Sequence, residues 1–559
     1  MRPAHAVFFG LVFCLLLLGG CDRSSKDDQK RQNVQAPAPA KAAPSADAGE
    51  PVAGGRIVMA LIGEPSNLIP PLASDSASHE VADLLYVSPL RYDKDIKLEC
   101  MAAERFEVLE DGKLLKFALR PGIRWTDGVE LTAEDVEFTY KLMIDPKTPT
   151  AYAEDYKQIE SFTVTGKYTF EVRYAEPFAR SLATWAGAIL PKHVLAGQDL
   201  MTTRYAREPI GAGPYVLTSW EPGRSLTLTV NPDYFEGRAY LDQVVYRIIP
   251  DTSTMFLELK AKNLDMMGLT PQQYLYQTTG PSWEADWQKF KYLSFGYTYL
   301  GYNLKSPFFT DVRVRRAIAQ AVNKEDIVKG AILGLGLPTI GPYKPGTWVY
   351  DTDIKDYAFD PAAAKALLAE AGWQDRNGDG VLEDASGRPF SFTILTNQGN
   401  EARIKAATII QSQLAAVGIK VAIRTVEWAS FIKEFVDKGN FDALVLGWSI
   451  AQDPDNYDVW HSSRAVPGGL NFVGYKNPEV DALLERGRRT VDQAERKKIY
   501  DAFQEILHRD QPYLFLFAPY SLPILSSRIQ NVAVAPAGIS YNFTKWWIPR
   551  DKQNFRLEQ

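Results

Sequence analysis

Strand-like and helix-like segments alternate through residues 390–446, and this alternation limits the possible folds more than any other feature of the sequence. The strand-like segments are apolar runs, at residues 390–396, 419–423 and 441–446. The helix-like segments lie between them, at residues 400–417 and 428–435. Asn400 can cap the first helix and Gly418 can end it. Because strands joined by helical crossovers of one hand lie parallel, the sequence predicts an α/β fold with a parallel sheet covered by helices.

The carboxyl ends of these strands are the expected place for a ligand site, because ligands of open α/β sheets bind beyond that edge. The residues that follow the strands are 397–403, Glu427 and 448–455. In the first half of the chain, Thr132 with Asp135 three residues later predicts the start of a further helix.

The N-terminus has the pattern of an export signal. A short basic start precedes an apolar run at residues 6–18, which is too short to span a bilayer. The run ends in Leu18-Gly19-Gly20-Cys21, which resembles a bacterial lipobox. We therefore expect residues 1–20 to be a signal peptide and Cys21 to carry lipid; the alternative is a chance cysteine after an apolar run. In Gram-negative lipoproteins, an Asp at the position of Asp22 implies retention at the inner membrane.

Residues 21–53 contain charged residues, Gln, Ser and Ala-Pro repeats, with almost no large apolar side chains. Such a segment cannot bury a core, so we expect a flexible linker between the lipid anchor and the folded part. The net charge of −6, with both signs interspersed, argues against nucleic acid as a partner. Once Cys14 leaves with the signal peptide, Cys100 is the only free thiol, so no internal disulfide is expected.

Three motifs invite comparison with catalytic or phosphate-binding sites, and each departs from its template. Ser449 follows a strand as in a nucleophile elbow, but Ala451 stands where the second Gly belongs. His79-Glu80 lacks the second His of a zinc motif. Gly211-Ala212-Gly213 lacks the third Gly and the helix of a phosphate loop, which favours a tight backbone turn. No nucleophile with its base emerges, so the sequence does not predict an enzyme.

A short acidic loop partly matches an EF-hand calcium loop. Its first, third, fifth and sixth positions are Asp375, Asn377, Asp379 and Gly380. The last position is Ser386, where a bidentate Glu belongs, although Glu383 or Asp384 can substitute in a shorter loop. Two interpretations stay open, a hydrated Asx/Gly turn or a structural Ca²⁺ site. No cofactor is required in either case.

Five signatures, in order along the chain, resemble the family 5 bacterial extracellular solute-binding proteins, which include oligopeptide, dipeptide and nickel-chelate receptors. The signatures are Glu64-Pro65-Ser66-Asn67-Leu68-Ile69-Pro70, residues 119–128 with 131–136, Gly211-Ala212-Gly213-Pro214-Tyr215, residues 311–317, and Asn471 with residues 477–481. The similarity extends from Gly54 to about Ile548.

This resemblance implies an α/β, two-lobed periplasmic-binding-protein fold of type II, similar to cluster C, with an extra inserted domain. The first lobe would comprise residues 54–84, 201–295 and 510–548. The inserted domain would comprise residues 85–200, and the second lobe, which contains the strand–helix alternation, residues 296–509. Residues 549–559 would form a C-terminal tail.

The resemblance also implies a function, that of a substrate-binding lipoprotein of an ABC importer in the periplasm. The protein would capture a peptide or a similarly sized solute between its lobes, as a monomer, and deliver it to a membrane permease driven by ATPase subunits. Its membrane contact would be the lipid anchor alone. Two alternatives stay open, an exported lipid-anchored hydrolase and a solute sensor or chaperone that uses the same lobes.

The expected ligand-binding residues are Trp448, Ser449, Ile450, Asp453, Asn303, Asn471, Gln398 and Arg403. In peptide-binding relatives, an Asp four residues before the Pro of the segment matching Asp453-Pro454 pairs with the peptide's α-ammonium. Here that position is Ile450, and an ammonium buried without a carboxylate is costly. Unless Asp453 or Asp455 reaches the ligand, the resemblance predicts an N-blocked or cyclic peptide, or a non-peptide solute, with Arg403 pairing with a carboxylate.

Overall fold

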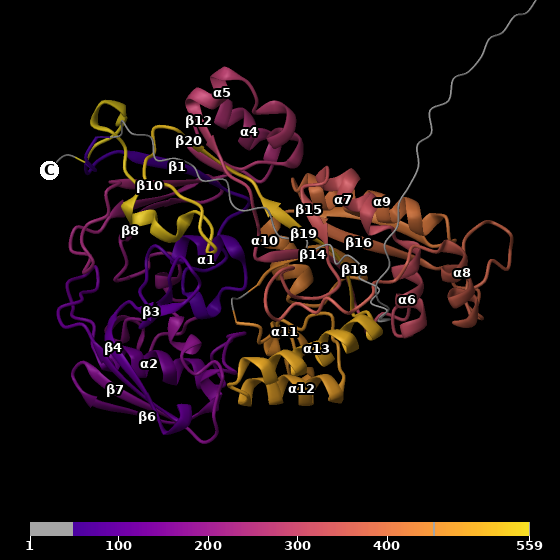
Figure 1. The fold of residues 1–559 in the computed structure, drawn as a ribbon, viewed down its shortest axis with the longest axis horizontal. Helices are drawn as coiled ribbons and strands as arrows, with labels where there is room; N and C mark the ends of the chain where they lie inside the picture. Colours follow the sequence, from indigo (N-terminus) through magenta and orange to yellow (C-terminus); the bar gives the residue numbers. More distant parts are fainter. Residues whose placement is uncertain (1–48, 451–452, 558–559) are drawn as a thin grey trace, which may run out of the picture. The chain divides into compact units, whose positions relative to one another are not determined.

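The computed structural model describes residues 49–450 and 453–557 (Figure 1). The expected signal peptide, Cys21, Asp22 and most of the expected linker lie outside the described residues. In the ranges that the structure describes, no helix is both long enough and apolar enough to cross a membrane.

The first large sheet has seven strands, which come from segments far apart in the sequence. In spatial order they are β12 (Trp287–Lys289), β20 (Pro523–Ser526), β11 (Met266–Gly268), β1 (Arg56–Leu61), β10 (Gln243–Ile248), β9 (Ser225–Val230) and β8 (Tyr215–Glu221). Strand β1 is parallel to β10 and β11, and the other pairs are antiparallel. Alternate residues of β1 and β9 are buried, so one face of this sheet packs on a core that includes Leu226 and Trp546.

The second large sheet contains the predicted strand–helix alternation. In spatial order its strands are β13 (Tyr292–Leu293), β19 (Tyr513–Ser521), β14 (Gly296–Tyr302), β18 (Ala443–Ser449), β16 (Ser391–Asn397) and β17 (Lys420–Val426), with β15 (Gly336–Pro338) paired to β19. Strand β16 is parallel to β17 and β18, which confirms the predicted parallel unit. Strand β14 is antiparallel to β18 and β19, so the complete sheet is mixed.

Helices cover both faces of the second sheet, and β14 is buried at every position. One face packs on α6 (Val312–Ala321), α7 (Lys324–Ile332), α8 (Pro361–Glu370) and α9 (Glu401–Ala415). The other packs on α10 (Trp428–Ser430), α11 (Tyr457–Trp460), α12 (Pro478–Arg489) and α13 (Gln493–Asp510). Asn400 caps α9 as predicted, since its Oδ1 accepts a hydrogen bond from Arg403 N at 3.1 Å. The second predicted helix is α10 followed by a π-helical turn at Phe431–Val436.

The chain between α1 (Ser76–Ala82) and β8 forms an inserted part with two small antiparallel sheets. One sheet pairs β2 (Leu90–Tyr92) with β3 (Leu98–Cys100), and the other has the order β4 (Ala103–Leu109), β5 (Leu114–Leu119), β7 (Thr169–Tyr174), β6 (Ile159–Gly166). Helices α2 (Ala133–Ile144) and α3 (Lys192–Leu195) accompany them, and α4 (Thr252–Lys260) and α5 (Pro281–Asp286) follow the inserted part. Asp135 Oδ2 accepts a hydrogen bond from Thr132 N at 2.8 Å, which fixes the start of α2.

Strand pairing shifts two of the expected domain boundaries. Strand β13 pairs with β19, and β19 pairs with β14, so the chain leaves the first sheet after β12 and returns to it only at β20. The expected crossing points were residues 295 and 510, but the apolar strand Tyr513–Ser521 lies in the second sheet, where most of its side chains are buried. The C-terminal segment also packs on the first sheet, because Gly55 N donates to Phe555 O at 3.0 Å and Leu557 N to Asp242 Oδ2 at 3.1 Å.

Candidate functional site

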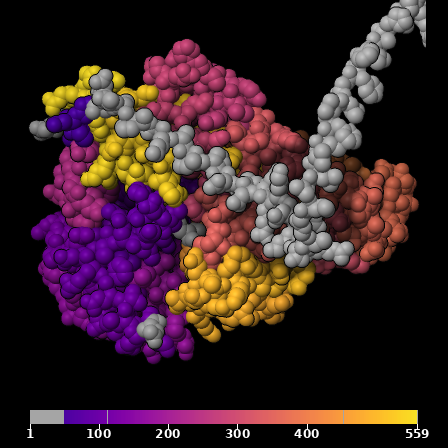
Figure 2. Space-filling view, viewed as in Figure 1, coloured from indigo at the N-terminus to yellow at the C-terminus, as the bar shows by residue number. Residues whose placement is uncertain are grey.

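A cavity of about 1350 Å³ lies at the carboxyl ends of β16, β17 and β18. Its wall combines residues of α1, of the inserted part and of the second sheet, among them His79, Tyr156, Tyr297 and Trp448. In the space-filling view, the inserted part adjoins the orange segment that carries α12 and α13 (Figure 2). The cavity therefore lies at the sheet edge where α/β proteins bind ligands, and three parts of the chain enclose it.

Five of the expected ligand-binding residues line this cavity, namely Trp448, Ser449, Ile450, Asp453 and Arg403. The antiparallel pairing of β18 with β14 sets Trp448 opposite Tyr297. The Trp448 ring stacks on Phe472 with 5.7 Å between the centroids, and its Nε1 donates to Tyr513 Oη at 3.3 Å. These contacts fix the indole, which gives the cavity a rigid aromatic surface.

The other expected residues, Asn303, Asn471 and Gln398, do not line the cavity. The Asn303 amide donates to Phe441 O at 2.8 Å and so holds the turn before β18. The buried Asn471 amide donates to Tyr475 O at 2.8 Å and accepts from Tyr475 N at 3.0 Å. Gln398 lies outside the cavity lining and is exposed. The two asparagines use their amides to satisfy loop backbone groups, which is the commoner role of a buried Asn.

Arg403 brings a positive charge to the cavity wall without an acidic partner. Its Nη1 donates to Asn397 Oδ1 at 2.8 Å, and its guanidinium lies over the backbone of Gly447, where a Cβ would stand 2.9 Å from Nη2. In the described part of the chain, no carboxylate lies within 4.0 Å of it. Burial lowers the pKa of Arg403 to about 10. A half-buried, unpaired guanidinium is a suitable partner for a carboxylate of a ligand.

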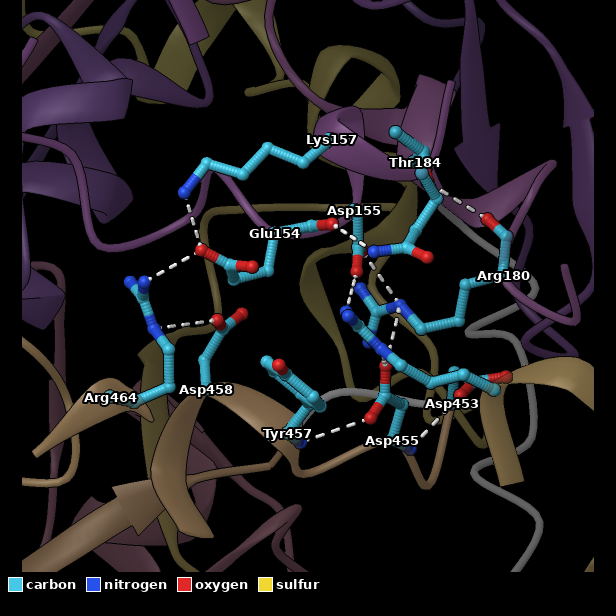
Figure 3. Close-up of polar contacts among 12 residues, drawn as sticks. Glu154, Asp155, Lys157, Arg180, Thr184, Asp453, Asp455, Tyr457, Asp458 and Arg464 are labelled. Carbon is cyan, nitrogen blue, oxygen red and sulfur yellow. Dashed lines mark hydrogen bonds and ion pairs between the residues drawn. The ribbon is translucent and has the colours of Figure 1, made fainter. Parts of the chain in front are cut away.

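The two acidic residues that the sequence offered for a ligand's ammonium are both held by arginines. Figure 3 shows Asp455 with its neighbours Asp453, Asp155 and Arg180. Asp453 accepts two hydrogen bonds from Arg496, at 2.9 and 3.1 Å. Asp455 binds Arg488 Nε at 2.7 Å, and the two side chains are only 2% and 4% exposed. Although burial raises it, Arg488 and Arg180 hold the pKa of Asp455 below its usual value. Neither carboxylate is free to neutralise a ligand.

The same ion-pair network continues into the inserted part. Arg488 also binds Asp155, which Arg180 Nε approaches to 2.9 Å. Beside it, Arg464 Nη1 lies 2.9 Å from Glu154 Oε1, and its Nη2 donates to Ala151 O at 2.8 Å. These contacts join residues 151–180 to residues 453–496, and the sequence analysis did not predict them. Their partners are hundreds of positions apart, so no local pattern could identify them.

Helix α1 forms the acidic side of the cavity, which the sequence analysis also missed. Asp75, Glu80 and Asp83 line the cavity, and Asp75 caps the helix by accepting from Ser78 N at 2.9 Å. Glu80 and Asp83 are exposed to the cavity, yet the cavity walls restrict their hydration, and this effect, with the like charge of Asp83, raises the pKa of Glu80 to about 7. In the second lobe, burial and Asp75 raise the pKa of Asp437 to about 6. The only local indication was the spacing of Glu80 and Asp83, which places both on one helical face.

The three motifs compared with catalytic sites do not form one in the described residues. Ser449 Oγ makes no hydrogen bond to a histidine or carboxylate there, and His79 Nε2 lies 3.1 Å from Ala73 O. A Cβ on Gly211 would stand 1.8 Å from Leu85 O, so this glycine allows close backbone packing. The geometry offers a binding wall rather than a nucleophile with a base.

The acidic loop at residues 375–384 brings three carboxylates together, from Asp375, Asp379 and Glu383, with their oxygens within 4.8 Å of one another. Buried Glu383 supplies the carboxylate that the sequence lacked at the last loop position. Asn377 Nδ2 donates to Glu383 Oε1 at 2.6 Å, and Asp375 accepts from Gly378 N at 2.7 Å. Oxygen ligands at this spacing fit Ca²⁺, and the hydrogen bonds fit an Asx turn, so both interpretations remain.

The sequence matches the family model for bacterial extracellular solute-binding proteins, family 5 Middle, over residues 97–468. It is 34% identical to the oligopeptide-binding protein AppA of Bacillus subtilis over 518 residues, which are 90% of this chain and 93% of the relative. The structure of that protein, solved in complex with a nonapeptide, matches with a TM-score of 0.85 over 90% of this chain and all of the other.

Two further solved structures are similar at a TM-score of 0.80. The periplasmic binding protein DppA of Helicobacter pylori, in complex with the peptide STSA, is 28% identical and covers 89% of this chain and 98% of its own. NikZ of Campylobacter jejuni, in complex with Ni(L-His), is 25% identical and covers 88% of this chain and 99% of its own.

Proposed function

The chain belongs to family 5 of the bacterial extracellular solute-binding proteins, and we propose that it is the periplasmic, lipid-anchored peptide receptor of an ABC importer. It has the two-lobed fold of that family. Its homologues are substrate-binding proteins, which points away from an enzyme. In this proposal the receptor is a monomer that encloses its ligand and delivers it to a membrane permease with ATPase subunits.

The size of the cavity is the observation that carries the proposal. Its volume of about 1350 Å³ exceeds the roughly 300–1,000 Å³ of typical small-molecule sites. The wall offers aromatic surfaces such as Trp448 and polar groups from three parts of the chain. A peptide of several residues fits this combination better than a single amino acid or a metal ion, and the similar Bacillus subtilis protein was solved with a nonapeptide.

The charges in the wall support a particular orientation of the ligand's ends. Arg403 has no acidic partner in the described ranges, so in this proposal it pairs with a carboxylate of the peptide. The family resemblance places Ile450 where an ammonium-binding Asp is expected, and Asp453 and Asp455 are held by arginines. None of these three positions supplies a free carboxylate, so in this proposal they do not anchor the peptide's α-ammonium, and N-blocked peptides bind.

The first test is mass spectrometry of any ligand that co-purifies with the protein. The second is calorimetry with pentapeptides whose amino ends are free or acetylated and whose carboxyl ends are free or amidated. We expect binding that tolerates acetylation and weakens at least ~10-fold on amidation, since one charge-assisted contact is worth about 1.5–3 kcal/mol. Arg403→Met should bind the acid and amide forms equally. If no peptide binds and none co-purifies, the peptide assignment is wrong.

The lipid anchor is part of the proposal and rests on Leu18-Gly19-Gly20-Cys21, outside the described residues. Replacing Cys21 with Ala should release the protein from the membrane fraction or leave it unprocessed. Cys100→Ala is the matched control and should stay with the membrane. A mature Cys21→Ala protein that still sediments with membranes would contradict the lipobox.

A further inference from the structure

Helix α1 turns two unpaired carboxylates toward the cavity. Glu80 and Asp83 both line it, and their spacing of three residues places them on one helical face. In the described ranges, no nitrogen of Lys, Arg or His lies within 4.0 Å of either carboxylate, and neither accepts a hydrogen bond. Two arginines of the inserted part line the cavity, and both are already bound: Arg91 to Glu99 at 2.7 Å and Glu236 at 2.6 Å, and Arg180 to Asp155 at 2.9 Å. The wall around α1 therefore has negative charge without a counter-charge.

A third group on the same side of the cavity points independently to a ligand. Tyr86 follows α1, where its backbone N donates to Ala82 O at 3.1 Å and continues the helical turn. Its side chain is only 5% exposed and lines the cavity, yet its hydroxyl makes no hydrogen bond within the part of the chain that the structure describes. The ring is buried and the hydroxyl opens onto the cavity without a partner among the described residues, so a ligand or water in the cavity can take that hydrogen bond.

We propose that Glu80, Asp83 and Tyr86 form a subsite for a basic side chain of the bound peptide, a lysine or an arginine. This inference rests on the proposed peptide-binding function and adds the class of peptide that is selected. An ammonium or guanidinium placed there would pair with both carboxylates and donate to the tyrosine hydroxyl oxygen. A ligand that pairs with the charged and polar groups left unpaired in a cavity is favoured over a ligand that leaves them unpaired.

The electrostatics of this wall agree with the geometry. Restricted hydration within the cavity, and then the like charge of Asp83, raise the pKa of Glu80 to about 7, and restricted hydration also raises the pKa of Asp83, against the attraction of His79. Two neighbouring carboxylates that are costly to ionise together gain most from an added cation. Arg403 is unpaired in the same cavity, so the favoured ligand combines a basic side chain with a carboxylate.

The experiment compares N-acetylated pentapeptides that are identical except for one central residue, lysine or its uncharged isostere norleucine. Calorimetry on the wild-type protein should show the lysine peptide binding roughly 10- to 100-fold more tightly, the ratio expected for one charge-assisted contact. In Glu80→Gln/Asp83→Asn this preference should disappear while norleucine-peptide binding is retained. Tyr86→Phe should reduce the preference by a smaller factor, and Glu284→Gln, which removes an exposed acid outside the cavity, should leave it unchanged.

The outcomes separate this inference from the proposed function. Equal binding of the lysine and norleucine peptides by the wild type would overturn the basic subsite while leaving a peptide receptor. The basic subsite would also be overturned if the double variant kept its preference for the lysine peptide. It would be overturned likewise if the wild type bound only peptides with a free α-ammonium and the double variant no longer bound them. Failure of every peptide to bind would overturn both. Near-ultraviolet circular dichroism checks the fold of the double variant, whose melting temperature should not fall because the removed charges have no partner.

Discussion

At the residue scale, the cavity contains charges of two kinds, those that the protein neutralises itself and those that it leaves open. Asp453 and Asp455 belong to the first kind, because Arg496 and Arg488 bind them. Arg403, Glu80 and Asp83 belong to the second kind in the described part of the chain. Glu80 and Asp83 are exposed to the cavity and Arg403 is partly buried in its wall, so all three can reach a ligand and are the residues to test first.

The raised pKa of Glu80 predicts a pH-dependent stability in the ligand-free protein. Because the folded-state pKa is about 7, above the ordinary value for a Glu side chain, the folded state binds a proton that the unfolded state has released. The contribution of Glu80 to stability therefore decreases as the pH rises from about 4.5 to about 7. Glu80→Gln should melt at the same temperature as the wild type near pH 4.5 and at a higher temperature above pH 7. Melting curves of both proteins at both pH values test this. The same difference in melting temperature between variant and wild type at the two pH values would contradict it.

Ile450 gives a second prediction at this scale. Replacing it with Asp puts a carboxylate at the cavity wall, at the position where the family resemblance implies an ammonium-binding Asp. Ile450→Asp should gain affinity for free pentapeptides over acetylated ones, by roughly 10-fold for one charge-assisted contact. Ile450→Asn, of similar size without charge, is the control. Calorimetry in which the wild type already binds free peptides tightly and loses them on acetylation would refute the prediction.

At the element scale, the loop after α8 combines an Asx turn with three convergent carboxylates. The hydrogen bonds from Gly378 N and Gly380 N to Asp375 form the turn, at 2.7 and 3.1 Å. The carboxylates of Asp375, Asp379 and Glu383 face one another without a cation of the protein between them in the described residues. Such a loop is stable as a turn and becomes more stable if Ca²⁺ neutralises the acidic cluster.

The prediction for this loop concerns Ca²⁺ binding. If it binds, the melting temperature of metal-stripped protein should rise with Ca²⁺ concentration, by an amount equivalent to about 2.7 kcal/mol at 100 times the Kd. Mg²⁺ should have less effect, because it demands a smaller octahedral shell. Asp379→Asn should remove the response, and peptide affinity should be unchanged throughout, since the loop does not line the cavity. No heat of binding and no shift in melting would favour the plain Asx turn.

At the scale of the whole molecule, buried ion pairs join the inserted part to the second sheet's helices. Arg488 on α12 binds Asp155, which lies 333 positions earlier in the sequence, and Arg464 binds Glu154. The Arg488 and Asp455 side chains are almost fully buried, so removing this cation would leave Asp455 and Asp155 to share Arg180, which lies 3.7 Å from Asp455 and 2.9 Å from Asp155. Breaking a buried pair on one side is strongly destabilising, unlike the loss of a surface pair.

Arg488→Met should therefore lower the free energy of unfolding by about 3–5 kcal/mol. The control is Lys498→Met, which removes a cation from the exposed pair with Glu495 on α13 and should cost at most about 1 kcal/mol. Urea denaturation of both variants measures the difference. Equal, small losses in the two variants would show that the network does not stabilise the contact between the inserted part and the helices.

The local sequence was sufficient to predict the parallel unit and its helices, because apolar periodicity and the Asn400 cap act within a few residues. It was also sufficient to place Trp448, Ile450 and Arg403 at the cavity, since residues that follow parallel strands meet at one edge of the sheet. The tertiary structure decided the rest. Whether Asp453 is free or paired, and whether Glu80 faces solvent or a cavity, depends on side chains from other parts of the chain. Charges act through space, and a sequence pattern records only neighbours along the chain.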